Sequence, residues 1–115
     1  MSVTIYHNPR CSKSRETLAL LESRDVQPEV VEYLKTPINE DTLSALLQKL
    51  GFTSAHQLVR SKETLYKELG LSKDSDEARI RQAMLENPKL IERPIVVKGE
   101  KAAIGRPPES VLDIL

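Results

Sequence analysis

The chain has 115 residues, which fits one compact domain, and its formal net charge of +0 argues against a nucleic-acid-binding domain. Cys11 is the single cysteine, so an internal disulfide is excluded, and with only two histidines a Cys-based metal site is disfavoured as well. The chain has no apolar stretch near the ~20 residues of a membrane helix and no visible signal peptide. We therefore expect a cytoplasmic protein with no nucleic-acid partner and no membrane partner.

A strand, a helix and a second strand are predicted in the first third of the chain. Val3–Tyr6 is short and β-prone, and Pro9 prevents the strand from continuing. A helix is predicted from Ser12, as a capping residue, to about Arg24, followed by a second strand over Glu29–Leu34. Three elements in about 35 residues have the size of a βαβ unit with a right-handed crossover.

The middle of the chain is predicted to be helical. Asn39 or Asp41 can cap a helix whose leucines follow helical spacing, and Gly51 is a natural end for it. Two short helical segments are expected next, and a further helix starts at Asp76 and ends near Asn87.

The last third returns to strands. Ile95–Val97 and Ala102–Ile104 are predicted to pair as a hairpin, and a final helix is expected over Ser110–Leu115. The order of elements predicts an α/β, thioredoxin-like fold, in which a mixed four-stranded sheet carries a helical insertion between its second and third strands. We expect residues 1–115 to form a single domain.

Cys11 is the candidate nucleophile, because it lies between a strand and the start of a helix. Unpaired backbone N–H groups and the helix dipole favour an anion there, and both lower the pKa of a thiol. The same surroundings suit an oxyanion substrate. The alternative is that Cys11 is a small buried hydrophobe. The neighbours that add positive charge or hydrogen bonds are Arg10, Lys13, Arg15, His7 and Ser14.

Two common cysteine motifs are absent. Cys11 and Arg15 are separated by three residues, so the five-residue spacing of a phosphatase loop is missing. A Cys-x-x-Cys redox pair is missing too, because Ser14 occupies its second position.

Three segments in the right order resemble one family. His7–Leu18 resembles the active-site segment of the glutaredoxin-linked, ArsC-like arsenate reductases. Arg93–Val97 is similar to that family's second signature, and Gly105–Glu109 followed by Val111–Leu115 is similar to its third. The chain resembles a short branch of this family.

The resemblance implies an arsenate reductase in which the Cys11 thiolate attacks arsenate. By position, the arginines implied to bind the oxyanion are Arg60, Arg93 and Arg106. For Arg60, the sequence without the resemblance favours a solvent-exposed charge on a helix. Pro94 is implied to be a cis-proline that presents backbone beside the sulfur. The resemblance also implies that no cofactor is bound, that glutathione is the co-substrate and that glutaredoxin is the protein partner, so we expect no need for a second cysteine on this chain. His7, Ser14 and Arg15 are supporting residues.

Two other functions stay open, because fold and motif do not fix a substrate. The first is a glutathione-linked thiol oxidoreductase without arsenate activity, which rests on the same low-pKa Cys11. The second is a non-enzymatic transcription regulator that binds RNA polymerase. Members of that branch usually carry a Cys-x-x-Cys switch, and Ser14 argues against it.

Overall fold

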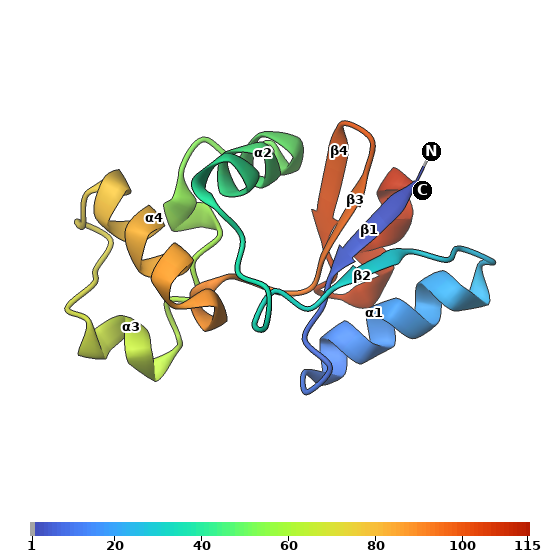
Figure 1. Cartoon of the computed structure of the whole chain (residues 1–115), viewed down its shortest axis with the longest axis horizontal. Helices are drawn as coiled ribbons and strands as arrows, with labels where there is room; N and C mark the ends of the chain where they lie inside the picture. Colours follow the sequence, from blue (N-terminus) through green and yellow to red (C-terminus); the bar gives the residue numbers. More distant parts are fainter. Residues whose placement is uncertain (1) are drawn as a thin grey trace. The chain divides into compact units, whose positions relative to one another are not determined.

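The computed structural model describes residues 2–115 of the chain (Figure 1). They form two compact units, one made of residues 2–36 and 93–115 and the other of Pro37–Glu92. The second unit is thus inserted between two parts of the first. The single domain expected from the sequence stays a prediction. Within residues 2–115, no helix combines the length and the apolar character that crossing a bilayer requires.

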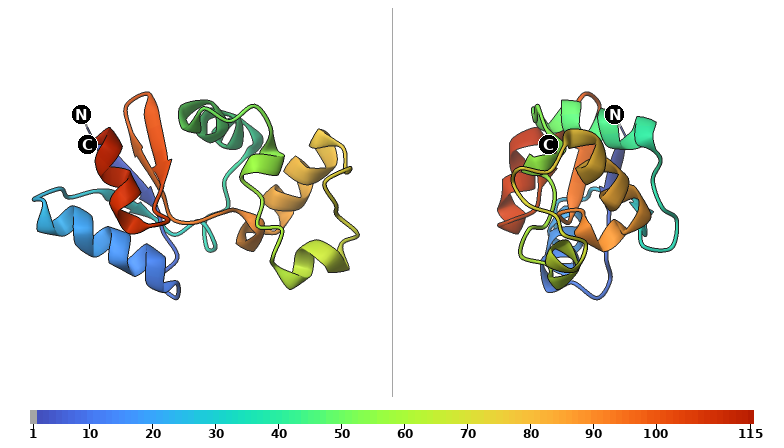
Figure 2. Two further views of the ribbon diagram at one scale, coloured as in Figure 1. Left: turned by 180° about the vertical axis from the view of Figure 1, so that it is seen from behind. Right: turned by 90° about the vertical axis from the view of Figure 1, so that its left-hand side faces the viewer.

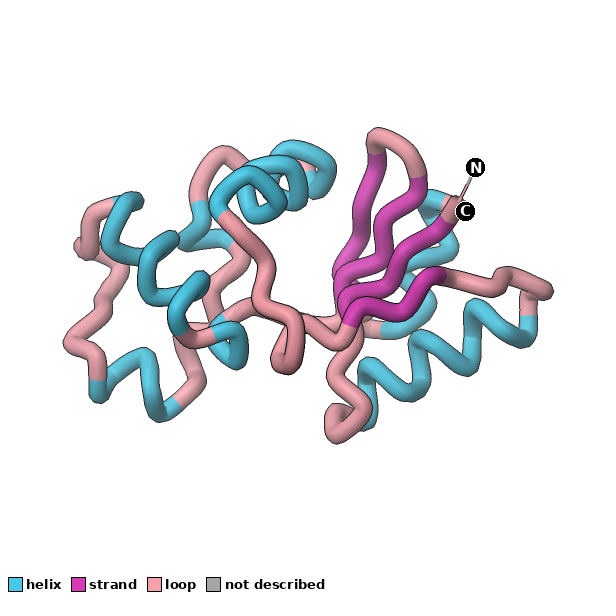
Figure 3. The backbone as a smooth tube through the Cα atoms, in the orientation of Figure 1, coloured by secondary structure: helices cyan, strands magenta, loops and turns pink. Residues whose placement is uncertain are grey.

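The first unit contains a four-stranded mixed sheet in the order β2-β1-β3-β4 (Figure 3). Its strands are β1 (Val3–Tyr6), β2 (Glu29–Val31), β3 (Ile95–Lys98) and β4 (Lys101–Ile104). β1 is parallel to β2 and antiparallel to β3, and β3 is antiparallel to β4. The predicted sheet and the position of the helical insertion are confirmed.

The second strand is shorter than the predicted Glu29–Leu34. β2 pairs only with β1, and the register ends where Tyr6 meets Val31. The backbone then turns, with the N–H groups of Lys35 and Thr36 donating to the carbonyl of Glu32 at 2.9 and 3.0 Å. The β-prone pattern of the sequence continues to Leu34, but the strand itself ends earlier because its partner β1 ends at Tyr6.

Two helices cover one face of the sheet in this unit (Figures 1 and 2). They are α1 (Ser12–Ser23) and the 3₁₀ helix η3 (Pro108–Ile114), which contact each other. The buried side chains of this core are aliphatic: Val3, Ile5, Leu21, Val96 and Val111. The final helix was expected at Ser110–Leu115; it begins earlier, at a proline with the fixed φ that suits the start of a helix.

The second unit is helical. Its elements are α2 (Glu40–Leu50), η1 (Ala55–Gln57), α3 (Thr64–Glu68), α4 (Glu77–Glu86) and η2 (Pro88–Leu90). The caps expected for α2 are confirmed, because the Asn39 side chain accepts a hydrogen bond from the Thr42 N–H at 2.8 Å and Gly51 adopts a φ of 77°.

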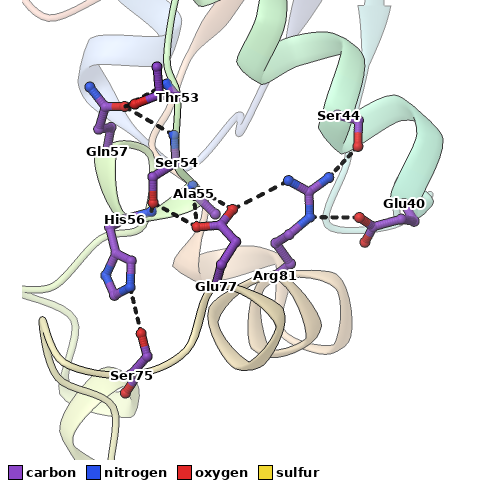
Figure 4. Close-up of polar contacts among 10 residues, drawn as sticks. All are labelled: Glu40, Ser44, Thr53, Ser54, Ala55, His56, Gln57, Ser75, Glu77 and Arg81. Carbon is purple, nitrogen blue, oxygen red and sulfur yellow. Dashed lines mark hydrogen bonds and ion pairs between the residues drawn. The ribbon is translucent and has the colours of Figure 1, made fainter.

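Glu77 and Arg81 of α4 link this helix to η1 and to α2 (Figure 4). The Glu77 carboxylate accepts hydrogen bonds from the Ser54 hydroxyl at 2.6 Å and the Ala55 N–H at 2.9 Å, at the start of η1. Arg81, one turn along α4, binds Glu77 at 3.4 Å and Glu40 of α2 at 2.6 Å. Burial raises the pKa of Glu77, but these hydrogen bonds and the charge of Arg81 outweigh burial and lower the pKa.

Candidate active site

Cys11 occupies the residue position directly before α1. Its backbone is extended, with φ −94° and ψ 125°, and its carbonyl accepts the first intrahelical bond from the Arg15 N–H at 3.0 Å. The cap predicted at Ser12 is therefore wrong by one residue, because Cys11 is the N-cap residue. The first turn of α1 has no acidic residue, so its N-terminal N–H groups can stabilise an anion at this end of the helix.

The surroundings of the sulfur favour the thiolate. Burial raises the pKa of the Cys11 thiol, because it disfavours the charged form. Hydrogen bonds from the backbone N–H groups of Ser14 and Lys13 and from the Arg93 side chain act the other way, as does the charge of Arg93. Their combined effect is larger, and the pKa of Cys11 lies below its ordinary value. A lowered pKa places more of the thiol in its nucleophilic form at neutral pH.

Ser14 anchors the loop that carries the cysteine. Its hydroxyl oxygen accepts a hydrogen bond from the Asn8 N–H at 3.0 Å and lies 2.7 Å from Nδ1 of His7. His7 is fixed in turn, because its N–H donates to the carbonyl of Val31 at 2.8 Å. The loop between β1 and α1 is therefore tied at both ends, which holds the Ser14 N–H at the sulfur.

The cationic residues next to Cys11 in sequence are engaged with the loop and with α1. The Arg15 guanidinium donates to the Pro9 carbonyl at 2.9 Å, and Lys13 forms an exposed ion pair with Glu16 at 3.6 Å. The Arg10 side chain is exposed. Arg15 thus contacts the loop that carries Cys11, and its supporting role stays a prediction.

Arg106 reaches the sulfur from the C-terminal part of the chain. Its Nη2 lies 3.6 Å from Sγ of Cys11, and its Nε donates to the Arg93 carbonyl at 2.8 Å. Within residues 2–115, the buried Nε of Arg93 has no hydrogen-bond partner. A buried donor without a partner is costly, and a bound oxyanion would satisfy it. The structure therefore brings Cys11, Arg93 and Arg106 together.

Pro94 and Gly105 bring the two arginine segments close together. The Arg93–Pro94 peptide bond is cis, as the resemblance implies, and the Arg106–Pro107 bond is cis as well. Gly105 donates its N–H to the Pro94 carbonyl at 2.9 Å. A Cβ at Gly105 would overlap the Thr17 hydroxyl and come within 2.8 Å of Cγ of Pro94, so only glycine fits here.

Arg60 belongs to the other unit. Its guanidinium pairs with Glu63 at 3.0 Å and with Glu92 at 3.5 Å, and its N–H donates to the Leu90 carbonyl at 2.7 Å. A role for Arg60 toward an oxyanion stays a prediction.

Comparison with known proteins gives a consistent result. A family model described as the ArsC family matches residues 6–114. The chain belongs to the ArsC family. A protein of Escherichia coli strain K12, called uncharacterized protein YfgD, is 61% identical over 98% of this chain and 96% of its own length. A protein of Haemophilus influenzae named arsenate reductase is 52% identical, with both chains covered in full. The structure of the arsenate reductase from Vibrio cholerae superimposes with a TM-score of 0.96 at 53% identity, covering 100% of this chain and 98% of that one.

These comparisons agree with the fold derived from the sequence and structure. The chain has the α/β, thioredoxin-like fold of the ArsC family, and the matched segment contains every residue of the candidate site. No group of three His, Cys, Asp or Glu side chains that could hold a metal ion occurs in the described part of this ArsC protein.

The sequence did not identify three residues that shape this ArsC site. Asn8 is buried and its side chain accepts the Arg10 N–H at 3.0 Å, whereas Thr17 and Gly105 touch across the fold. The Asn-Pro pair is a turn signal that points to Asn8. No local sequence pattern predicts the contact of Thr17 with Gly105, because the two residues are far apart in the chain.

Proposed function

We propose that this protein is an arsenate reductase that takes its electrons from glutathione and glutaredoxin in the cytoplasm. The proposal rests on one observation: the Cys11 sulfur lies at a helix N-terminus, 3.6 Å from Nη2 of Arg106 and beside Arg93, whose buried Nε lacks a protein partner in residues 2–115. Arsenate is a tetrahedral dianion near neutral pH, and guanidinium groups and helix N-termini bind such anions. Relatives 47–52% identical to this chain carry the name arsenate reductase.

In the first step of the proposed reaction, the sulfur of Cys11 bonds to arsenic. One arsenic–oxygen bond breaks and the oxygen leaves as water, so the oxidation state of arsenic does not change. The developing negative charge on the arsenate oxygens is stabilised by Arg93 and Arg106, with Arg60 as the third arginine of the family. The thiolate form of Cys11 is the attacking species, which is why its lowered pKa matters.

The second and third thiols come from outside the chain. Glutathione bonds to arsenic through its sulfur and displaces a second oxygen as water. The glutaredoxin thiol then attacks the glutathione sulfur, forming a mixed disulfide and leaving two electrons on arsenic. Water finally replaces Cys11 on arsenic, which releases arsenite and restores the thiol. No second cysteine on this chain is required.

A coupled assay tests the proposal. Purified protein is mixed with arsenate, glutathione, glutaredoxin and glutathione reductase, and NADPH consumption is followed. We expect arsenate-dependent turnover that is lost in Cys11→Ser and strongly reduced in Arg93→Gln and Arg106→Gln. We expect Arg60→Gln to raise the KM for arsenate. Turnover no higher than in Cys11→Ser would refute the proposal.

The lowered pKa of Cys11 also supports a second candidate, a glutathione-linked thiol oxidoreductase. In this reaction the thiolate attacks a glutathione mixed disulfide, releases the other thiol, and is regenerated by a second glutathione. Reduction of a glutathionylated small molecule without any arsenate turnover would favour this candidate.

A further inference from the structure

Thr17 is a polar residue buried within α1, and the reaction proposed above does not use it. Its side chain is 0% exposed. Its hydroxyl donates a hydrogen bond to the Lys13 carbonyl, one turn earlier in α1, at 2.8 Å. A bond of this kind satisfies the hydroxyl but does not stabilise the helix, and alanine has a higher helix propensity than threonine. The contribution of this side chain therefore lies in its contacts outside the helix.

Outside the helix, the Thr17 side chain faces Gly105, the residue directly before Arg106. A Cβ placed on Gly105 would overlap the Thr17 hydroxyl and come within 3.1 Å of Cγ2 of Thr17. The same Cβ would come within 2.8 Å of Cγ of Pro94, which directly follows Arg93. Thr17 and Pro94 therefore fill the space around Cα of Gly105 from two sides. Because protein interiors are close-packed, a shift of one of these residues is transmitted to the others.

Both segments at this contact carry an arginine of the candidate site. Gly105 and Pro94 are joined by the hydrogen bond from the Gly105 N–H to the Pro94 carbonyl at 2.9 Å. One residue further along each segment, Nε of Arg106 donates to the Arg93 carbonyl at 2.8 Å. The two arginine segments are thus fixed to each other, and we expect them to move together relative to α1.

The position of these segments relative to α1 matters because the reacting sulfur belongs to the helix. Cys11 is the N-cap residue of α1, and Nη2 of Arg106 lies 3.6 Å from its sulfur. Guanidinium groups bind an oxyanion through hydrogen bonds of defined geometry, and a misplacement of about 1 Å can cost about 10²-fold in rate. Thr17 is a direct packing contact between α1 and the arginine segments.

We infer that Thr17 is a positioning residue, whose side chain spaces α1 from the arginine segments and so places Arg93 and Arg106 relative to Cys11. The shape of the side chain performs this function, because both of its branches, Oγ1 and Cγ2, lie against Gly105. Valine keeps two branches at this position, whereas alanine has neither. The inference rests on the proposed function, in which these arginines bind an oxyanion.

Oxyanion binding can be measured without turnover. Sulfate is a tetrahedral dianion that forms no bond with a thiolate. When it binds between the arginines it should slow the alkylation of Cys11 by iodoacetamide, and its effect on the rate at constant ionic strength gives a Kd. We expect Thr17→Ala to raise this Kd roughly fivefold or more, and Thr17→Val to keep it within about twofold. Thr17→Ser, which loses only Cγ2, should lie between them and replaces Thr17→Ala if that variant folds poorly.

Val3→Ala is the matched control for a loss of stability. Val3 is a buried residue of the same core, at the opposite end of β1 from the loop that carries Cys11. This variant should lower the free energy of unfolding, as Thr17→Ala does, but leave the Kd for sulfate unchanged. An equal rise in both variants would overturn the inference.

Three further results would also overturn the inference. The first is a Kd in Thr17→Ala within about twofold of that of the unchanged protein. The second is a rise in Thr17→Val as large as in Thr17→Ala, because the hydrogen bond to Lys13 and not the shape of the side chain would then be responsible. The third is no protection by sulfate in the unchanged protein, because there would then be no oxyanion site to position.

The coupled arsenate assay separates this inference from the proposed function. Thr17→Ala should raise the KM for arsenate in parallel with the Kd for sulfate, while the KM for glutathione stays the same. Weaker sulfate binding by Thr17→Ala, together with no arsenate turnover by the unchanged protein, would refute only the proposed reaction. Arsenate turnover by the unchanged protein, with the same arsenate KM in Thr17→Ala, would refute only the role of Thr17.

Discussion

The hydroxyl oxygen of Ser14 lies 2.7 Å from Nδ1 of His7, and the two residues are only 0% and 6% exposed. This contact joins the end of β1 to the first turn of α1, on either side of Cys11. Ser14 occupies the position of the second cysteine in a Cys-x-x-Cys motif, but here the side chain anchors the loop. Its own N–H points to the sulfur, so the anchor and the anion site share one residue.

Removing this anchor should affect both stability and reactivity. In Ser14→Ala, the Asn8 N–H and Nδ1 of His7 lose their partner in a buried site, which costs about 1–3 kcal/mol of the free energy of unfolding. We also expect a higher Cys11 pKa, because the loop no longer holds the Ser14 N–H in place. Urea unfolding and the pH dependence of iodoacetamide alkylation measure the two effects. Ser12→Ala, at an exposed position of the same turn, should change stability by less than about 0.5 kcal/mol.

His7 should make the stability of the protein depend on pH. Burial lowers the pKa of His7 below its ordinary value of 6.5; Glu32 opposes this shift and Arg15 adds to it. Below about pH 6.5 the unfolded chain therefore binds a proton at His7 that the folded chain does not bind. The free energy of unfolding should fall as the pH decreases from about 6.5 toward the folded-state pKa.

Urea unfolding at several pH values measures how the free energy of unfolding depends on pH. In His7→Gln, the part of this dependence that comes from His7 should be absent. A proton NMR titration of the folded protein gives the pKa directly. His56→Gln removes the other histidine and leaves a single imidazole to assign. A folded-state pKa at or above 6.5 would contradict the prediction.

Local signals account for the parts of the fold that were predicted well. Val3–Tyr6 has β-branched residues ended by a proline, and α2 has a capping asparagine and a terminal glycine in the left-handed conformation. Such patterns depend on neighbours in the chain. The length of β2 was not predictable in this way, since the strand ends where its partner β1 ends.

The candidate site was predicted in chemical type but not in geometry. The sequence placed Cys11 at a helix N-terminus and attributed its activation to the N–H groups and dipole of the helix and, in addition, to adjacent cations. In the structure, Arg15 instead binds the loop, and the guanidinium groups at the sulfur come from Arg93 and Arg106. The contact of Arg106 with the Arg93 carbonyl depends on the β3–β4 hairpin that brings the two residues together. Only the family resemblance pointed to these two arginines.

Gly105→Ala should damage the site through packing. The new Cβ overlaps Thr17 and contacts Pro94, both of which are buried, so the segment carrying Arg106 must move. Overpacking of this kind typically costs about 1–3 kcal/mol. Adding Thr17→Ala makes room for the methyl group and should recover part of the loss. The double-mutant cycle, measured by urea unfolding, should give a favourable coupling of about 0.5 kcal/mol or more, and strict additivity would refute the proposed clash.

Asp25→Gly should stabilise the protein. Asp25 has a φ of 61° after α1, and its N–H and that of Val26 donate to Glu22 and Leu21 at 3.1 and 3.0 Å, as in a Schellman motif. Glycine adopts this left-handed conformation without the steric cost of a Cβ, so we expect a gain of about 0.5–1 kcal/mol and a Tm higher by about 2–4 °C. Asp25→Ala keeps the Cβ and should show no gain. Thermal unfolding of the two variants compares them, and equal Tm values would contradict this explanation.

Arg93 should control the reactivity of Cys11. Its guanidinium favours the thiolate by a hydrogen bond and by charge, against the effect of burial, so Arg93→Gln should raise the Cys11 pKa toward its ordinary value of 9.0. At neutral pH a smaller thiolate fraction follows, and alkylation by iodoacetamide should slow. Arg93→Lys keeps the charge but not the planar donor group. In this variant the Cys11 pKa should therefore lie between the values for the unchanged protein and for Arg93→Gln. Lys101→Gln is the control. It also removes one positive charge, at an exposed position on β4, and should leave the pKa of Cys11 unchanged. If Arg106→Gln raises the pKa while Arg93→Gln does not, the 3.6 Å contact of Arg106 is the dominant one instead.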